Sequence, residues 1–145
     1  AGGFPMGGMI AFGEKLAALF TPGSHGSTFA GNPLGAAAGL ATLDVIEDEN
    51  LVANAEARGE QLRDGIMATG NPLFVSVRGR GLLDAVELKH PCSHAVMNYC
   101  LEHGLIVNAV APNALRFAPP LIVTAQDVDQ ALAILKDVPT DLPDD

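Results

Sequence analysis

The stretch GSHGSTFAGNPLGAAAG, residues 23–39, places small and hydroxyl-bearing side chains ahead of a proline and an alanine-rich run. Asn32 followed by Pro33 predicts the start of a helix, because an asparagine side chain caps the free N–H groups and proline suits the first helical position. We expect this helix to cover residues 33–49, with one thin face of alanines and glycines that suits close packing against another backbone. So few bulky side chains indicate that another group comes close to the backbone here.

Two interpretations fit the hydroxyl residues ahead of that helix. Ser27 and Thr28 lie between Gly26 and Gly31, and small hydroxyl residues beside exposed N–H groups suit an anion such as phosphate. The same residues can instead form a Ser/Thr turn that leads the chain into the helix. The residues alone favour the turn, and both interpretations are carried forward.

The remainder of the first half consists of glycine-rich segments and helices. Residues 1–32 alternate glycines with short apolar runs, which predict a short strand at 9–12 and a helical turn or two at 14–20. A second long helix is expected at 51–68, where apolar residues repeat at helical spacing. Residues 1–70 therefore offer no evident sheet of their own and depend on structure elsewhere.

The character of the sequence changes at about residue 71, where β-branched and apolar runs begin to alternate with turns. The expected elements are strands within 73–89, a helix at 93–103, a hairpin at 105–117 and a last helix after the capping-box pair Thr124 and Asp127. We expect residues 71–145 to form a compact α+β unit that can fold alone. The acidic tail, residues 139–145, is expected to fray.

Composition argues against several classes of function. The chain has 145 residues, enough for one domain, and a formal net charge of −9 with only eight lysines and arginines, which argues against nucleic acid as a partner. No apolar run approaches the roughly 20 residues of a membrane span, and no signal-peptide pattern is present, so we expect a cytoplasmic protein. Cys92 and Cys100 have no metal-ligand spacing, so we expect free thiols and no metal site.

Arg116 is the second candidate for binding a ligand. It lies inside the otherwise apolar run ALRFAPPLIV, residues 114–123, where a guanidinium is costly unless it is paired. Such an arginine either meets an acidic side chain of its own chain or binds a carboxylate ligand in bidentate geometry. The sequence leaves both alternatives open. Arg78 and Arg80 flank a glycine bend and are expected to be solvated or bonded to nearby carbonyl groups.

Three motifs together carry a resemblance to a known family. They are HGSTFAGNPLGAAAGLATLDVI at residues 25–46, VRGRGLLDAVEL at 77–88 and VNAVAPNALRFAPPLIV at 107–123. In this order and at these distances they resemble the class III pyridoxal-phosphate aminotransferases of the ornithine and acetylornithine type, with the acetylornithine branch the most similar. The resemblance covers nearly all of the chain.

The resemblance implies the α/β fold of a fold-type I pyridoxal-phosphate transferase, of which this chain would be the C-terminal part. Residues 1–70 would be the tail end of the large cofactor-binding domain together with interdomain helices. Residues 71–145 would be the small C-terminal α+β domain, with a mainly antiparallel sheet. Members of the family work as homodimers with active sites at the subunit interface.

The resemblance also implies roles for three residues. Thr28 matches the residue that reaches the cofactor phosphate of the neighbouring subunit, Ser27 matches a position beside bound substrate, and Arg116 matches the arginine that holds a substrate carboxylate. The lysine that forms the Schiff base with the cofactor would lie a couple of residues before Ala1. We therefore expect no catalytic residue in this chain and no activity from the chain alone. Asp84 departs from the family, whose members usually carry a small or apolar residue there.

The implied reaction is transfer of an amino group between N2-acetylornithine and 2-oxoglutarate, in arginine biosynthesis, with pyridoxal 5′-phosphate as cofactor. Another class III aminotransferase, acting on ornithine, succinylornithine or 4-aminobutyrate, is the alternative within the family. A non-catalytic interaction module derived from the fold is the alternative outside it. The thin helix face at residues 33–42 would then bind a partner chain.

Overall fold

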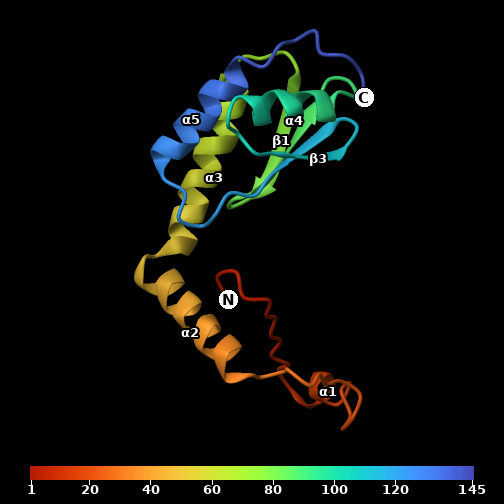
Figure 1. The fold of residues 1–145 in the computed structure, drawn as a ribbon, viewed down its shortest axis with the longest axis vertical. Coiled ribbons are helices and arrows are strands. Elements are labelled where there is room, and N and C mark those ends of the chain that lie inside the picture. Colours follow the sequence, from red (N-terminus) through yellow and green to blue (C-terminus); the bar gives the residue numbers. More distant parts are fainter. The chain divides into compact units, whose positions relative to one another are not determined.

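The computed structural model describes all 145 residues. They divide into two compact units, residues 1–49 and 50–145. Figure 1 shows the first unit in red to orange and the second in yellow to blue. Each unit is described by itself.

The first unit contains two helices, α1 (Glu14–Ala17) and α2 (Pro33–Asp48), joined by turns and irregular segments. The α2 helix starts as predicted, since Asn32 accepts a hydrogen bond through Oδ1 from the Gly35 N–H at 2.8 Å. The strand predicted at residues 9–12 is wrong, because these residues have no regular structure. A strand needs a neighbour to pair with, and all four strands of the chain lie in the second unit and pair with one another.

The thin face of α2, which we expected to pack against another backbone, packs closely against side chains instead. A Cβ added to Gly35 would lie 2.9 Å from Phe4 Cε1, and one added to Gly39 would lie 3.1 Å from Met6 Sδ. The partners are therefore side chains from the first residues of the same unit. A residue larger than glycine at either position would displace them.

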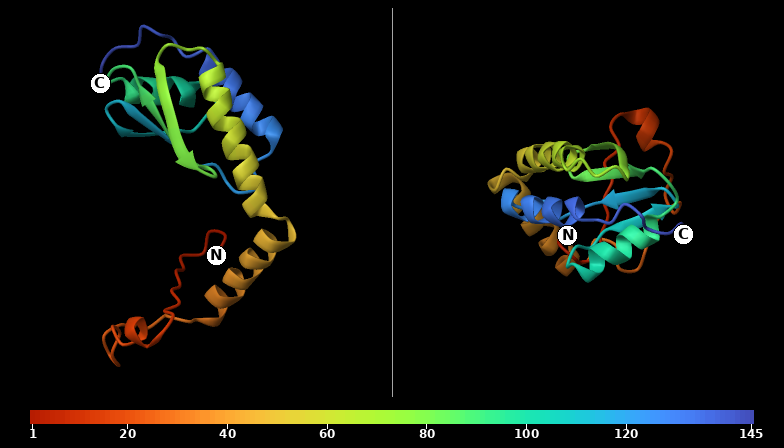
Figure 2. Two further views of the ribbon diagram at one scale, coloured as in Figure 1. Left: turned by 180° about the vertical axis from the view of Figure 1, so that it is seen from behind. Right: turned by 90° about the horizontal axis from the view of Figure 1, so that it is seen from above.

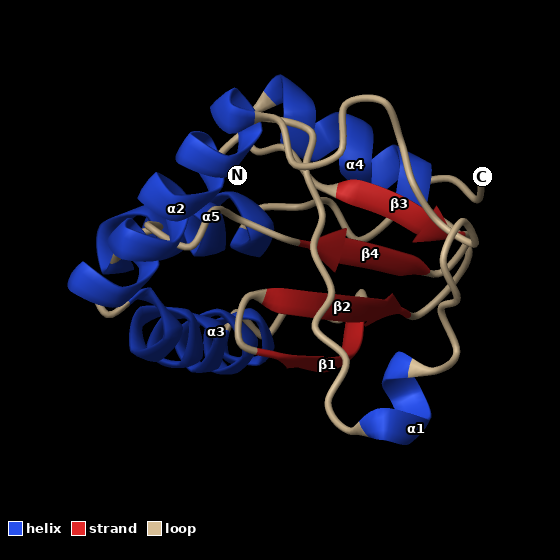
Figure 3. Cartoon of the chain, turned by 90° about the horizontal axis from the view of Figure 1, so that it is seen from below, coloured by secondary structure: helices blue, strands red, loops and turns tan.

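The second unit is a four-stranded antiparallel sheet with three helices (Figure 3). Its elements are α3 (Leu51–Ala68), β1 (Phe74–Arg80), β2 (Leu83–Leu88), α4 (Ser93–Glu102), β3 (Asn108–Ala111), β4 (Ala114–Phe117) and α5 (Ala125–Lys136). The strand order is β1-β2-β4-β3. The predicted strands, hairpin and helices of residues 71–145 are confirmed, including the capping box of Thr124 and Asp127 at the start of α5.

The helices cover one face of this sheet. Along β2, Val86 and Leu88 are buried, whereas Leu83, which points to the other face, is 62% exposed. Helix α3 packs on β1, α4 packs on β3 and β4, and α5 lies beside α3 (Figure 2). The core thus lies between the helices and one face of the sheet, and we call the other side the open face.

The boundary between the units lies at residue 50, whereas the sequence suggested a boundary near residue 70. The difference arises because α3 belongs to the core of the second unit: Leu62 and Ile66 are only 3% and 1% exposed. Asn50 adopts the left-handed conformation, with φ 51°, and lies between the end of α2 and the start of α3. The assignment of the two units to the domains of a longer enzyme stays a prediction.

The acidic tail is docked, and the prediction that it frays is wrong. The Asp145 carboxylate accepts hydrogen bonds from the His94 and Ala95 N–H groups and from Ser93 Oγ, at the N-terminus of α4. Partial desolvation opposes ionisation, but a hydrogen bond with the His94 ring at Nδ1, together with these hydrogen bonds, outweighs it and lowers the pKa of Asp145 to about 2. Unsatisfied N–H groups at a helix start attract a carboxylate, which is why this tail has a binding place.

Helix α3 approaches the turn between β1 and β2 very closely. The turn contains Gly81 at φ +56°, and a Cβ added to Gly59 of α3 would overlap the Gly81 carbonyl group. Because that neighbour is backbone, it cannot rotate away. Gly59 is therefore required by packing, although glycine is a poor helix former.

We expect Gly59→Ala to lower the free energy of unfolding by about 1–3 kcal/mol, the usual cost of overpacking. An alanine in an open helix position would instead stabilise by roughly 0.5–1 kcal/mol. Urea unfolding of the chain, followed by circular dichroism, measures the difference. The matched control is Gly65→Ala on the same helix, where the three atoms nearest to the added Cβ belong to the Leu132 side chain and not to backbone, so the loss should be smaller. Equal stability of Gly59→Ala and wild type would contradict the packing argument.

Candidate functional site

The loop ahead of α2 presents two free hydroxyl groups. Ser27 and Thr28 are exposed, and neither side chain makes a hydrogen bond within the chain. The turn is closed instead by backbone and asparagine groups: the Ala30 N–H donates to the Ser27 carbonyl at 3.1 Å, and Asn32 Nδ2 donates to the Phe29 carbonyl at 3.0 Å. The Ser/Thr-turn interpretation is therefore wrong in its detail, because the hydroxyls do not form the turn.

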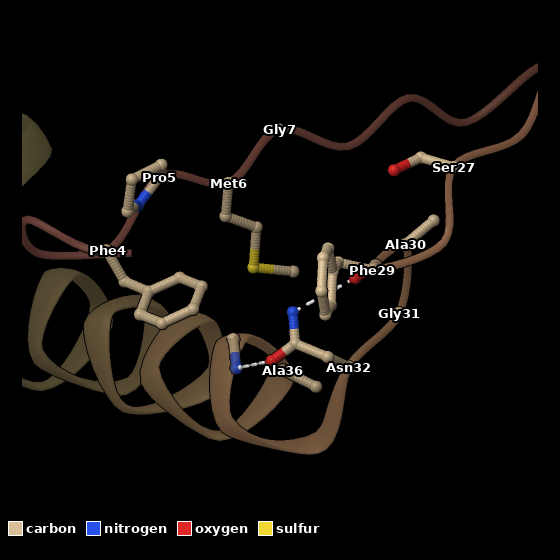
Figure 4. Close-up of a pocket in the computed structure, with 11 residues that line it drawn as sticks. Phe4, Pro5, Met6, Gly7, Ser27, Phe29, Ala30, Gly31, Asn32 and Ala36 are labelled. Atoms are coloured by element: carbon tan, nitrogen blue, oxygen red, sulfur yellow. Dashed lines mark hydrogen bonds between the residues drawn. The ribbon is translucent and has the colours of Figure 1, made fainter.

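A hollow of about 500 Å³ lies beside this loop (Figure 4). It is lined by residues from three places: Phe4–Gly7 in the first segment, Ser27 and Phe29–Asn32 in the loop, and Gly35 and Ala36 in α2. The structure therefore brings Ser27 to the hollow and leaves Thr28 outside its lining. The walls are largely apolar, with the Ser27 hydroxyl among the few polar groups.

Arg116 lies on the open face of β4 and is exposed. Its only hydrogen bond within the chain runs from Nη2 to Asn108 Oδ1 at 3.1 Å. No carboxylate lies within 4.0 Å of the guanidinium, since the ion pairs of the chain involve Arg63, His90 and His94. Of the two alternatives left by the sequence, an acidic partner within the chain is therefore absent, and the charge of Arg116 is available to a ligand.

Two hollows meet at Arg116. One, of about 370 Å³, is largely apolar and includes Asn108 and the Pro119–Pro120 turn. The other, of about 500 Å³, lies over the open face and includes Arg78, Ala85 and Val110. An arginine at the junction of two hollows can hold the charged end of a ligand whose body occupies either one. Ser27 and Thr28 belong to the first unit and Arg116 to the second, so the chain presents two separate candidate sites.

Asn108 is the site residue that sequence reasoning missed. Counting outward from the Ala111–Ala114 pair of the hairpin would place Ala109 opposite Arg116. An irregularity between Ala109 and Ala111 shifts the pairing by one residue, so that Asn108 is the partner of Arg116. The hairpin itself was predictable, but this shift has no local signal in the sequence.

Asp84, at a position where the resemblance leads us to expect a small or apolar residue, forms a buried ion pair. It is 1% exposed, and Arg63 Nη1 of α3 lies 3.0 Å from its Oδ1. Arg63 also donates to the Gly81 carbonyl at 3.0 Å, while Asp84 Oδ2 has no partner. Burial raises the pKa of Asp84, although the hydrogen bond and charge of Arg63 act in the opposite direction. The pair links α3 to β2 at Asp84. The next residue of β2, Ala85, is the strand partner of Arg116.

We expect Arg63→Met to lower the free energy of unfolding at pH 7 by about 3–5 kcal/mol, because it leaves a buried carboxylate without its partner. A carboxyl whose pKa is raised in the folded state costs stability as the pH rises above its unfolded value of about 3.9. The deficit relative to wild type should therefore shrink as the pH is lowered toward 4.

Denaturant unfolding across this pH range measures the effect. The control is the double variant Arg63→Met with Asp84→Leu, which removes both charges and should recover most of the loss. A deficit that does not change with pH would show that Arg63 acts through packing alone.

Other candidate chemistries find no support in the structure. Cys92 and Cys100 are buried free thiols, and burial raises the pKa of Cys100 to about 11, so neither is a ready nucleophile. No group of three or more potential metal ligands is present. None of the helices combines the length and apolar character needed to cross a membrane.

Comparison with known sequences finds aminotransferases as relatives of this chain. The family described as "Aminotransferase class-III" matches residues 1–138. The acetylornithine aminotransferase of Gloeobacter violaceus is 43% identical over 145 residues, covering 98% of this chain and 36% of that protein. The acetylornithine aminotransferase of Mycobacterium tuberculosis is 47% identical over 134 residues, covering 92% of this chain and 33% of that protein. The chain thus spans about a third of the length of these relatives.

Solved structures show the same fold. The acetylornithine aminotransferase of Elizabethkingia anophelis matches with a TM-score of 0.73 and 38% identity, over 83% of this chain and 33% of that chain. An ornithine aminotransferase of Toxoplasma gondii, whose structure shows partial occupancy of pyridoxal phosphate at the active site, matches with a TM-score of 0.76 and 34% identity. That match covers 85% of this chain and 30% of the other.

Proposed function

The chain belongs to the class III aminotransferase family, and from this premise we propose that the protein that carries it transfers an amino group between N2-acetylornithine and 2-oxoglutarate. The observation that carries the proposal is the 43–47% identity to acetylornithine aminotransferases over nearly the whole chain. We further propose that the protein acts in arginine biosynthesis, and that it is a cytoplasmic homodimer as the family resemblance implies. Ornithine, succinylornithine or 4-aminobutyrate is the alternative donor, and the similarity to an ornithine aminotransferase supports keeping ornithine among them.

The loop ahead of α2 fits the phosphate of pyridoxal 5′-phosphate. Its two hydroxyls are exposed and without partners, and neither the Ser27 nor the Thr28 N–H has an acceptor within the chain. Such a donor set suits a phosphate group. We propose that Thr28 binds the cofactor phosphate of the neighbouring subunit and that Ser27 lies beside substrate.

The cofactor, when bound, supplies an electron-accepting ring for the negative charge that develops on the substrate carbon. The part of this chain is to bind and orient. Arg116 would hold a substrate carboxylate, because its guanidinium is exposed and has no acidic partner. A fork of parallel N–H donors matches a carboxylate in both geometry and charge.

Proton transfer is assigned to a lysine outside residues 1–145. The lysines of the chain are Lys15, Lys89 and Lys136, and none lines a hollow that contains Ser27 or Arg116. A base must come within hydrogen-bond reach of the proton it moves. We therefore propose that this chain supplies binding groups and that the base belongs to another part of the protein.

We expect the purified 145-residue chain to transfer no amino group from N2-acetylornithine to 2-oxoglutarate when pyridoxal 5′-phosphate is added. A coupled assay for glutamate measures this, with a protein extended to the full length of its relatives as the positive control. Glutamate formation by the chain alone would refute the assignment of the lysine. Its absence from the extended protein as well would favour the non-catalytic module.

In the extended protein, we expect Arg116→Lys to raise the KM for 2-oxoglutarate by about 10- to 100-fold, since a hydrogen bond to a charged group contributes roughly 1.5–3 kcal/mol. Lysine keeps the charge but loses the fork. The matched control is Arg80→Lys on β1, an exposed arginine that lines none of the three hollows described. An unchanged KM in Arg116→Lys would remove Arg116 from the site.

A further inference from the structure

The hydrogen-bond partner of Arg116 lies on the neighbouring strand of the sheet. Asn108 of β3 lies directly opposite Arg116 of β4 in the antiparallel register, and the hydrogen bond from Nη2 to Oδ1 spans 3.1 Å. Residues opposite one another in such a pair have Cβ atoms only about 4.5–5.5 Å apart. The contact therefore depends on the register of two paired strands and not on a loop.

The row of paired residues that contains Arg116 on the open face has no acidic member, although Asp84 and Asp127 each line one of the two hollows that meet at Arg116. Across the sheet, Ala85 of β2 is the partner of Arg116, and Arg78 of β1 is the partner of Ala85. One row thus runs Arg78, Ala85, Arg116, Asn108, with two positive charges and no negative one. Glu87 lies two residues from Ala85 on the same face of β2, where its carboxylate accepts a hydrogen bond from Ser76 Oγ at 3.0 Å and makes no ion pair with Arg116. In a chain with a net charge of −9, this row is locally positive.

The hydrogen-bond partner of Arg116 is a neutral amide and not a carboxylate. A guanidinium has five N–H donors, and Arg116 uses one of them within the chain. An amide oxygen accepts that bond without carrying charge, whereas an aspartate in the same place would form an ion pair. Asn108 can therefore restrict the motion of the side chain while the positive charge stays unneutralised.

We propose that Asn108 is a positioning residue that holds one edge of the Arg116 guanidinium and keeps its charge available for the carboxylate of the oxo-acid substrate. This inference rests on the proposed function. Asparagine suits the task because it is polar, short and neutral. A carboxylate at residue 108 would compete with the substrate for the same donors.

The test uses the extended protein loaded with pyridoxal 5′-phosphate. Asn108→Asp, which is nearly isosteric, should raise the KM for 2-oxoglutarate about tenfold or more while kcat changes by less than about threefold, the pattern of lost binding. Asn108→Gln keeps a neutral amide and should raise the KM less than Asn108→Asp. Equal effects of the two variants, or a loss confined to kcat, would overturn the inference.

A double-variant comparison separates positioning from a general structural effect. In an Arg116→Ala background, Asn108→Asp should produce no further increase in KM, because the group through which it acts is gone. A full additional increase in that background would overturn the inference, since Asn108 would then act independently of Arg116.

Calorimetric binding of 2-oxoglutarate to the same proteins distinguishes failure of this inference from failure of the proposed function. If wild type binds the oxo acid but transfers no amino group, and Asn108→Asp weakens binding about tenfold, the proposed function fails and the inference holds. If wild type is active and Asn108→Asp binds as tightly as wild type, only the inference fails. If wild type neither binds nor reacts, both fail.

Discussion

The close approach of α3 to the turn between β1 and β2 is the contact on which the second unit depends. Gly59 has no side chain, so the Gly81 carbonyl can lie directly against the helix. Arg63, one turn further along α3, donates to the same carbonyl and to Asp84 of β2. These contacts fix the β1–β2 hairpin on α3. Because β4 pairs with β2, they also determine where Arg116 lies.

The two faces of the sheet differ in how their charged side chains are paired. On the face that the helices cover, Asp84 is buried and is paired with Arg63, since an unpaired charge there would cost several kcal/mol. On the open face, Arg116 is bonded only to a neutral amide, which solvent makes tolerable until a ligand arrives. The carboxylate of a structural ion pair and an unneutralised arginine thus lie on the neighbouring strands β2 and β4, and the proposed function assigns substrate binding to the arginine.

In the first unit, as at Gly59 in the second, glycines allow other groups to approach a helix closely. Gly35 and Gly39 let Phe4 and Met6 lie against α2, and the loop before the helix keeps its hydroxyl groups free of internal hydrogen bonds. The chain spans about a third of the length of its relatives, and in the proposed function the remaining groups for amino transfer would lie outside residues 1–145. In the proposed function, the first unit would bind a phosphate and the second would bind a carboxylate.

The sequence by itself determined the features that depend on neighbours along the chain. The Asn32 and Thr124 caps, the hairpin at β3 and β4 and the helices followed from hydrogen bonds that span only a few residues, and the family followed from three motifs. Only the tertiary structure decided that residues 9–12 form no strand, that α3 belongs to the second unit, that Asp145 binds the start of α4, and that Asn108 lies opposite Arg116. Each of these depends on a partner far away in the sequence or on a one-residue shift in strand pairing. No local pattern of residues encodes such contacts, because their free energy arises only when the distant segments meet.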